Sequence, residues 1–139
     1  MTTKLFRLAG KLALPVLLAL TGLVADGGQV LVARRQMQGL AESAAHAGAA
    51  ELDSAAARAN PEQPAPLGPR AAELAAAQYI ATQEPGLTAS VQADAQRVVV
   101  HVRSRPIPMT LLRIAGIMQV LVTADASAEP RTGVTGAQR

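Results

Sequence analysis

A long apolar stretch lies near the N-terminus and is followed by a segment whose apolar residues have the spacing of a helix face. Between Lys11 and Asp26 lies the uncharged run LALPVLLALTGLVA. From Val30 onward, apolar and small residues recur every three or four positions and form one stripe along a helix. The stripe consists of Val30, Ala33, Met37, Leu40, Ala41, Ala44, Gly48 and Leu52. This pattern predicts one helix from about residue 5 to residue 59, membrane-embedded at first and amphipathic afterwards.

Two charged residues set the expected limits of the membrane segment. A helix needs about 20 residues to cross the hydrocarbon core. A span over residues 8–28 places Lys11 at the inner headgroups and Asp26 at the outer ones. A span over residues 12–33 would bury Asp26, and a central acid costs about 2.5–3.5 kcal/mol. We therefore expect the membrane to end at Asp26. An N-terminus inside and a C-terminal body outside are favoured by the cations Lys4, Arg7 and Lys11.

The same apolar run is also compatible with a secretory signal. Its fourteen uncharged residues match a signal-peptide apolar region of about 7–15 residues. A cleavage site of the small-x-small type is only half satisfied, because Leu23-Val24-Ala25 supplies just the final small residue. A secreted soluble binding domain with a cleaved signal peptide therefore remains an alternative.

The pattern after residue 59 predicts a linker and a second helix. Four prolines in NPEQPAPLGP, residues 60–69, cannot continue a helix. The following RAAELAAAQYIATQ, residues 70–83, consists mostly of good helix formers. The packing candidates on this second helix are Leu74, Ala77, Tyr79, Ile80 and Ala81.

After Pro85-Gly86 the apolar period changes to two, as expected for strands. Val91 and Ala93 alternate with polar residues, a turn is expected at residues 94–96, and MTLLRIAGI predicts a short helix. Two further alternating faces are Val98, Val100 and Val102, and then Val120, Val122, Ala124, Ala126 and Ala128. We therefore predict an α+β fold, with a three-stranded antiparallel sheet whose one buried face is covered by helix.

These elements divide the chain into five expected segments. They are an N-terminal cytoplasmic tip with the transmembrane anchor (1–28), an amphipathic Ala-rich helix (29–59), a Pro-rich linker (60–69), a small α+β head (70–129) and a flexible tail (130–139).

Charge argues against a nucleic-acid partner. The net charge is +3 and the pI is near 10.2, but residues 1–35 carry +4 and the remainder −1. The basic excess therefore flanks the apolar run. The two aromatic residues, Phe6 and Tyr79, supply no stacking platform for bases.

No constellation of residues predicts an enzyme, a metal site or a cofactor. The chain has no cysteine, which removes thiolate chemistry. Its ten acids are scattered and show no paired arrangement. His46 follows Glu42 by one turn and His101 alternates with valines on a strand, so both are interpreted as surface residues.

The order of residues at both ends of the chain resembles one family, the TadE/TadG-like proteins of the tight-adherence (Flp, type IVc) pilus system. Its members carry an LP-containing apolar run, an aspartate and glycine step, an arginine pair and an Ala-rich helix. The segment LLRIAGIMQVLVTADASAE also resembles the closing element of the family. Corresponding places are held by Leu14-Pro15, Asp26, Gly28, Arg34-Arg35, Gln38, Leu40, Glu42, Ala44, Ala45, Ala47, Gly48 and Ala49.

The departures from the family favour one branch. Members cleaved by the prepilin peptidase have a glycine at the cut and a glutamate five residues into the mature helix. Here Gly10 is followed at the fifth place by Pro15, and the first glutamate is Glu42. The resemblance therefore indicates a short TadG-like member that keeps its anchor.

The resemblance implies a pilin-like α+β fold and a non-enzymatic component that assists assembly or anchoring of a Tad pilus. It would be a single-pass protein of the cytoplasmic membrane, in contact with other Tad pilus subunits or assembly proteins. Homo- or hetero-oligomers would form through the N-terminal helix. A minor pilin-like filament subunit, cleaved after Gly10, is the other alternative.

Overall fold

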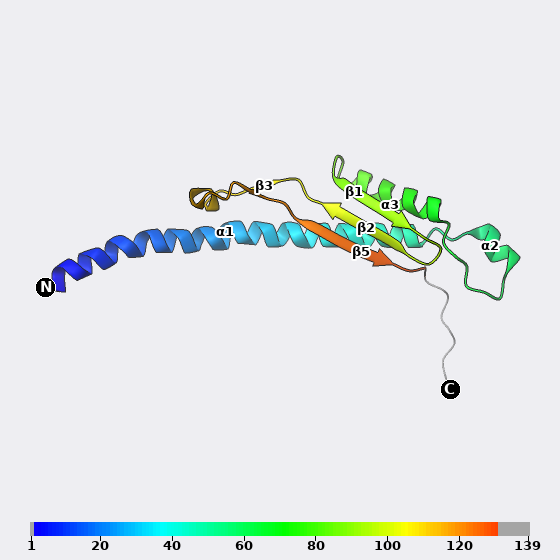
Figure 1. The fold of residues 1–139 in the computed structure, drawn as a ribbon, viewed down its shortest axis with the longest axis horizontal. Helices are drawn as coiled ribbons and strands as arrows, with labels where there is room; N and C mark the ends of the chain where they lie inside the picture. Colours follow the sequence, from blue (N-terminus) through cyan, green and yellow to red (C-terminus); the bar gives the residue numbers. More distant parts are fainter. Residues whose placement is uncertain (1, 131–139) are drawn as a thin grey trace, which may run out of the picture.

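A single long helix, α1 (Thr2–Ala49), organises the molecule. The computed structural model describes residues 2–130, with side chains described from Ala13 onward except those of Leu14, Leu18 and Ala115. The C-terminal half of α1 lies along the sheet, and its N-terminal end extends beyond the rest of the protein (Figure 1). The predicted long helix is thus confirmed. The Lys11 side chain, expected at the inner headgroups, lies outside the described part.

The helix ends ten residues earlier than predicted, at Ala49. A separate helix, α2 (Ser54–Ala59), begins after Asp53, whose side-chain oxygen accepts the backbone N–H groups of Ala55 and Ala56 at 2.9 and 3.0 Å. An aspartate at this place satisfies two N–H groups that a new helix leaves without partners. This local capping breaks the continuous helix that the Ala-rich composition predicts.

The Pro-rich segment is tied to the end of α1. The Asp53 N–H donates to the Pro66 carbonyl at 2.8 Å, and the Gly68 N–H donates to the Glu51 carbonyl at 2.9 Å. Leu67 is fully buried. Residues 66–68 therefore join the folded body, whereas residues 60–64 of the predicted linker are exposed.

The second helix, α3 (Pro69–Gln83), lies where it was predicted but turns a different face to the core. Ala72, Ala76 and Ile80 are buried, and Tyr79 is partly buried against them. The other expected packing residues, Leu74, Ala77 and Ala81, are exposed. Alanine occurs all around this helix, so the apolar period is too weak to select the contact face.

The main sheet has the predicted three antiparallel strands. They are β1 (Thr88–Ala93), β2 (Val98–Arg103) and β5 (Thr123–Ala128), in the order β1-β2-β5. Val100 lies opposite Val91 on one side and Ala126 on the other. Asp94 forms the β1–β2 turn by accepting the N–H groups of Gln96 and Arg97 at 2.7 and 2.8 Å. The α+β fold is confirmed.

An arm, residues 104–122, separates β2 from β5. It contains the short ladder of β3 (Ile107–Pro108) and β4 (Gln119–Val120), with the 3-10 helix η1 (Leu112–Ala115) at its tip. The expected strand over 119–129 is therefore divided, and Val120 pairs within the arm and not in the main sheet. The arm runs beside α1 toward the N-terminus, past the end of the sheet (Figure 1).

The core lies between one face of the sheet and the two helices α1 and α3. Small residues let the helices approach closely: a Cβ added at Gly48 would lie 2.8 Å from the Ala72 carbonyl oxygen and 3.1 Å from a Val98 methyl. The buried residues include Met37, Ala41, Ala44, Ala45, Val98, Val100 and Val102. The second half of α1 is therefore an integral part of the head.

Two glycines of α1 offer a matched test of this packing. We expect Gly48→Ala to destabilise the head by about 1–3 kcal/mol through overpacking. Gly39 has no atom within 4 Å of an added Cβ. We therefore expect Gly39→Ala to be neutral or to stabilise the helix by up to about 1 kcal/mol. Urea unfolding of the full chain in detergent micelles measures both, and shifts of the same sign would contradict the packing described.

Candidate functional site

Residues 13–32 of α1 present an apolar surface that the rest of the described chain leaves largely uncovered. Within the described chain, α1 is the one helix long and apolar enough to cross a membrane, judged by length and composition over Pro15–Ala49. Seven large apolar side chains between residues 13 and 32 are more than half exposed: Val16, Leu17, Leu20, Leu23, Val24, Leu31 and Val32. Such a surface requires a cover, either lipid or other helices.

The predicted helix-packing stripe lies further along α1, against the protein's own head. Met37, Ala41, Ala44 and Gly48 are buried there. Val30, Ala33 and Leu40 are partly buried against the same core. Leu52 is 46% exposed and lies beyond the end of α1, because the chain turns at residues 50–53 to pair with residues 66–68. The stripe is thus occupied within the molecule, and the free apolar surface precedes it.

Asp26 is covered by the arm, although the sequence placed it in the outer headgroup layer. Its side chain is only 1% exposed. Its carboxylate accepts the backbone N–H groups of Thr110, Leu111 and Leu112 at 3.2, 2.8 and 2.7 Å. These donors lie at the start of η1, where a helix leaves its N–H groups without internal partners. Asp26 therefore caps a helix 84 to 86 residues away in the sequence.

Gly22 extends this contact by one turn toward the N-terminus. A Cβ added at Gly22 would lie 2.6 Å from the Leu111 Cβ. The arm thus packs directly on the backbone of α1 inside the apolar run. We call Gly22, Asp26 and the chain of residues 110–112 the Asp26 clamp. The signal for this site in the sequence was an acid at the edge of an apolar run, because an acid that is buried there needs hydrogen-bond donors. The sequence did not identify which residues supply those donors.

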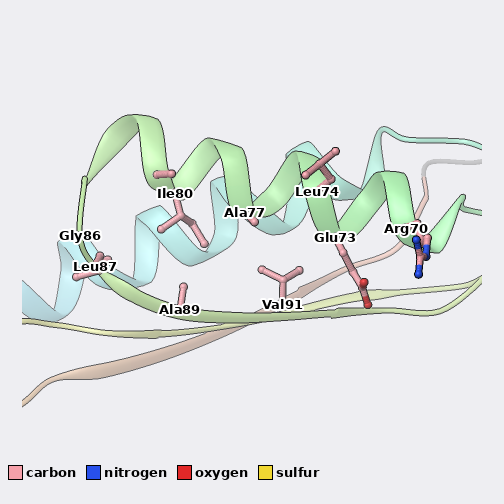
Figure 2. A pocket seen from close by; sticks show the side chains of 10 residues that line it. Arg70, Glu73, Leu74, Ala77, Ile80, Gly86, Leu87, Ala89 and Val91 are labelled. Atoms are coloured by element: carbon pink, nitrogen blue, oxygen red, sulfur yellow. The ribbon is translucent and has the colours of Figure 1, made fainter.

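A groove lies on the head between α3 and the outer strand β1, with a volume of about 660 Å³. Figure 2 shows its apolar lining of Leu74, Ile80, Leu87 and Val91, with Arg70 and Glu73 toward one end. Glu73 also accepts the Ala93 N–H at 3.1 Å, which ties the end of β1 to α3. The groove can receive apolar side chains from another molecule.

The opposite face of the sheet carries a row of polar residues. Ser90 lies opposite His101 on the neighbouring strand, and His101 lies opposite Asp125. The His101 Nδ1 and Asp125 Oδ1 atoms are 2.6 Å apart, with both side chains exposed. No hydrogen bond joins Ser90 to His101 in the described structure, so this row does not assemble a nucleophile and a base.

The remaining predicted surface groups stay apart. Glu42 accepts a hydrogen bond from Gln38 at 2.8 Å, and His46 is exposed one turn further along. Among residues 2–130, no three acidic, histidine or cysteine side chains gather as ligands of a metal ion.

Comparison with known proteins connects the long helix to one family. Residues 12–51 match the family described as "Tad: Putative Flp pilus-assembly TadE/G-like". The matched segment contains the exposed apolar run, Asp26 and the buried small-residue stripe. No curated protein and no solved structure matches the chain. The match confirms the resemblance found in the sequence over the N-terminal helix.

Proposed function

We propose that this TadE/TadG-like chain is a membrane-anchored structural component of a Tad (Flp) pilus or a related type IV-like secretion system. The observation that carries the proposal is the exposed apolar surface of α1 over residues 13–32, which lies inside the family-matched segment. The second half of the same helix forms part of the core of the head. Anchor and head are thus connected by one continuous element.

Lipid is the cover that best suits this surface. Burying apolar area contributes about 25 cal/mol for each Å², and seven large side chains in this part of α1 are more than half exposed. Moving the span toward the N-terminus would bring Lys4, Arg7 and Lys11 into the hydrocarbon. A span ending near Asp26 leaves those cations at the inner side, and we propose an N-terminus inside and a head outside.

Two surfaces remain for contacts with other subunits. Within the membrane, the first half of α1 can pack laterally against other helices, as small residues in such helices permit. Outside it, the groove between α3 and β1 offers an apolar lining on the edge of the head. We propose that both are used in assembly, because the small-residue stripe itself is already occupied.

The two alternatives make different uses of the same helix. A pilin-like filament subunit would pack its exposed half into a filament core, and an apolar helix attached to an α+β head is compatible with that role. A secreted domain would lose the run up to Ala25 by cleavage. Such a cut would remove Gly22, on which Leu111 packs, and would leave Asp26 at the new terminus. This contact favours a chain that keeps its apolar run.

Complementation in the native cells tests the proposal. We expect deletion of the gene to abolish surface pili and the wild-type chain to restore them. Leu74→Glu places a charge in the groove at a side chain that is 59% exposed. We expect this variant to fold and reach the membrane but to restore pili at less than about a tenth of the wild-type level, the loss expected when an anchor residue of an interface is removed.

The control is Ser127→Glu, an equally radical change at an exposed site on β5 away from the groove. It should restore pili fully. Normal piliation in the deletion strain would contradict the proposed function. Normal piliation with Leu74→Glu would contradict only the role of the groove and would leave the proposed function standing.

A further inference from the structure

We propose that the tip of the arm, residues 109–118, enters the outer leaflet of the same membrane that α1 crosses. The inference rests on the proposed membrane anchor and goes beyond it, because it assigns a lipid-binding surface to a segment far from the anchor in the sequence. The protein would then contact the membrane at two places. One is the span itself and the other is a short apolar hairpin beside it.

The tip exposes large apolar side chains that the head does not cover. Ile114 is 88% exposed and Met118 is 68% exposed. Ile117 and Leu111 are also among the exposed large apolar residues. Soluble surfaces rarely gather such residues in one short segment, and a gathered apolar patch marks a binding surface.

The position of the tip identifies lipid as its partner. Leu111 packs on Gly22, which lies one helical turn, about 6 Å, before Asp26 in the direction of the span. The tip is fixed at this level by the three N–H groups that bond to Asp26. A bilayer that embeds Gly22 therefore also reaches the residues packed on it. Figure 1 shows the arm beside α1 on the side of the sheet toward the N-terminus, where the exposed apolar residues of α1 also lie.

The charge of the arm agrees with this placement. Residues 105–122 contain Arg105 and Arg113 and no acid. Arg113 lies within η1 and is exposed. An arginine beside an apolar patch can keep its stem in the interface while its guanidinium binds lipid phosphate. Asp26, the acid nearest to the tip, has its carboxylate engaged by backbone N–H groups and covered from solvent.

A second membrane contact has a structural consequence. A single helix permits the head to rotate and tilt about the membrane normal, whereas an inserted tip at one side of that helix restricts both motions. The groove between α3 and β1 would then face a defined direction in the plane of assembly. The Asp26 clamp is the element that transmits this restriction from the arm to α1.

Single-cysteine labelling tests the proposal directly, because the chain has no cysteine of its own. The full chain is reconstituted into phosphatidylcholine–phosphatidylglycerol vesicles after labelling with the environment-sensitive fluorophore NBD. The labelled variants are Ile114→Cys at the tip, Val16→Cys in the apolar run and Leu74→Cys on the head. Quenching by spin-labelled lipids reports contact with lipid, and quenching by aqueous iodide reports contact with water.

We expect the Ile114→Cys label to emit at shorter wavelength, to be quenched by lipids labelled near the headgroup and to be protected from iodide. The Leu74→Cys label should show the reverse, and the Val16→Cys label should be quenched by lipids labelled deep in the chains. Lipid quenching at Val16→Cys combined with iodide quenching at Ile114→Cys would overturn the tip proposal and leave the anchor intact.

Two other outcomes also overturn the proposal. Absence of lipid quenching at both Val16→Cys and Ile114→Cys would remove the anchor together with the tip. Protection of Ile114→Cys from iodide without any lipid quenching would identify protein, such as a second copy of the chain, as the cover of the tip.

Discussion

Replacing Leu17 and Leu20 together by arginine should remove the protein from the membrane. Both side chains are more than half exposed and belong to the uncovered part of α1, so the head should fold normally. Each arginine near the centre of a span costs about 2.5–3.5 kcal/mol, and the pair about 5–7 kcal/mol. This cost shifts the insertion equilibrium by more than about a thousandfold.

Carbonate extraction of cell membranes measures this effect, with the wild-type chain expected in the pellet and the double variant expected in the supernatant or degraded. A matched control places two arginines on the same helix at Gln36 and Ser43, which are exposed beyond the proposed span. That control should stay in the pellet. Retention of the Leu17→Arg/Leu20→Arg variant after extraction would show that this run does not hold the protein in lipid.

Replacing Asp26 by asparagine should release the arm while the sheet stays intact. The carboxylate accepts three backbone N–H groups. An asparagine keeps one acceptor oxygen and turns its own N–H₂ group toward the remaining donors, so buried N–H groups lose their partners. We expect amide hydrogens of residues 110–112 to exchange at least about tenfold faster, whereas those of β2 remain protected.

Hydrogen exchange followed by mass spectrometry on the full chain in micelles reports both regions at once. Asp125→Asn is the control, because it changes the same functional group on an exposed side chain of β5. That variant should leave exchange in the arm unchanged. Equal exchange of residues 110–112 in wild type and Asp26→Asn would mean that the clamp does not hold the arm.

Local sequence patterns were sufficient for most of the elements. The apolar run and the stripe from Val30 predicted α1, the helix formers of residues 70–83 predicted α3, and the alternation at Val98, Val100 and Val102 predicted the buried face of β2. Asp94 lies in the predicted turn and forms it through its own side chain. Each of these features depends on neighbours within a few residues, which a pattern can record.

Features that depend on distant contacts were missed for physical reasons. Asp26 looked like an exposed residue at the membrane boundary, because its three donors lie in a segment more than 80 residues later. The face of α3 was predicted only in part: Ile80 and Tyr79 pack on the core, but contact with α1 and the sheet, and not the Ala-rich pattern, selects the rest of the buried side. The early end of α1 depends on Asp53 and on pairing with residues 66–68.

These missed features change how the function is assigned to surfaces. The resemblance implied oligomers through the N-terminal helix, but the small-residue stripe of that helix lies inside the head. The surfaces left for assembly are the exposed apolar part of α1 over residues 13–32, the tip of the arm and the groove beside β1. All three become available without any rearrangement of the core.

The intact mass of the protein recovered from cells tests the central claim, which is that the apolar run remains attached and holds the chain in the membrane. The carbonate-washed membrane fraction should contain a chain whose mass includes residues 13–25 together with the head. A chain that begins near Asp26 and is recovered from the soluble fraction would contradict the account.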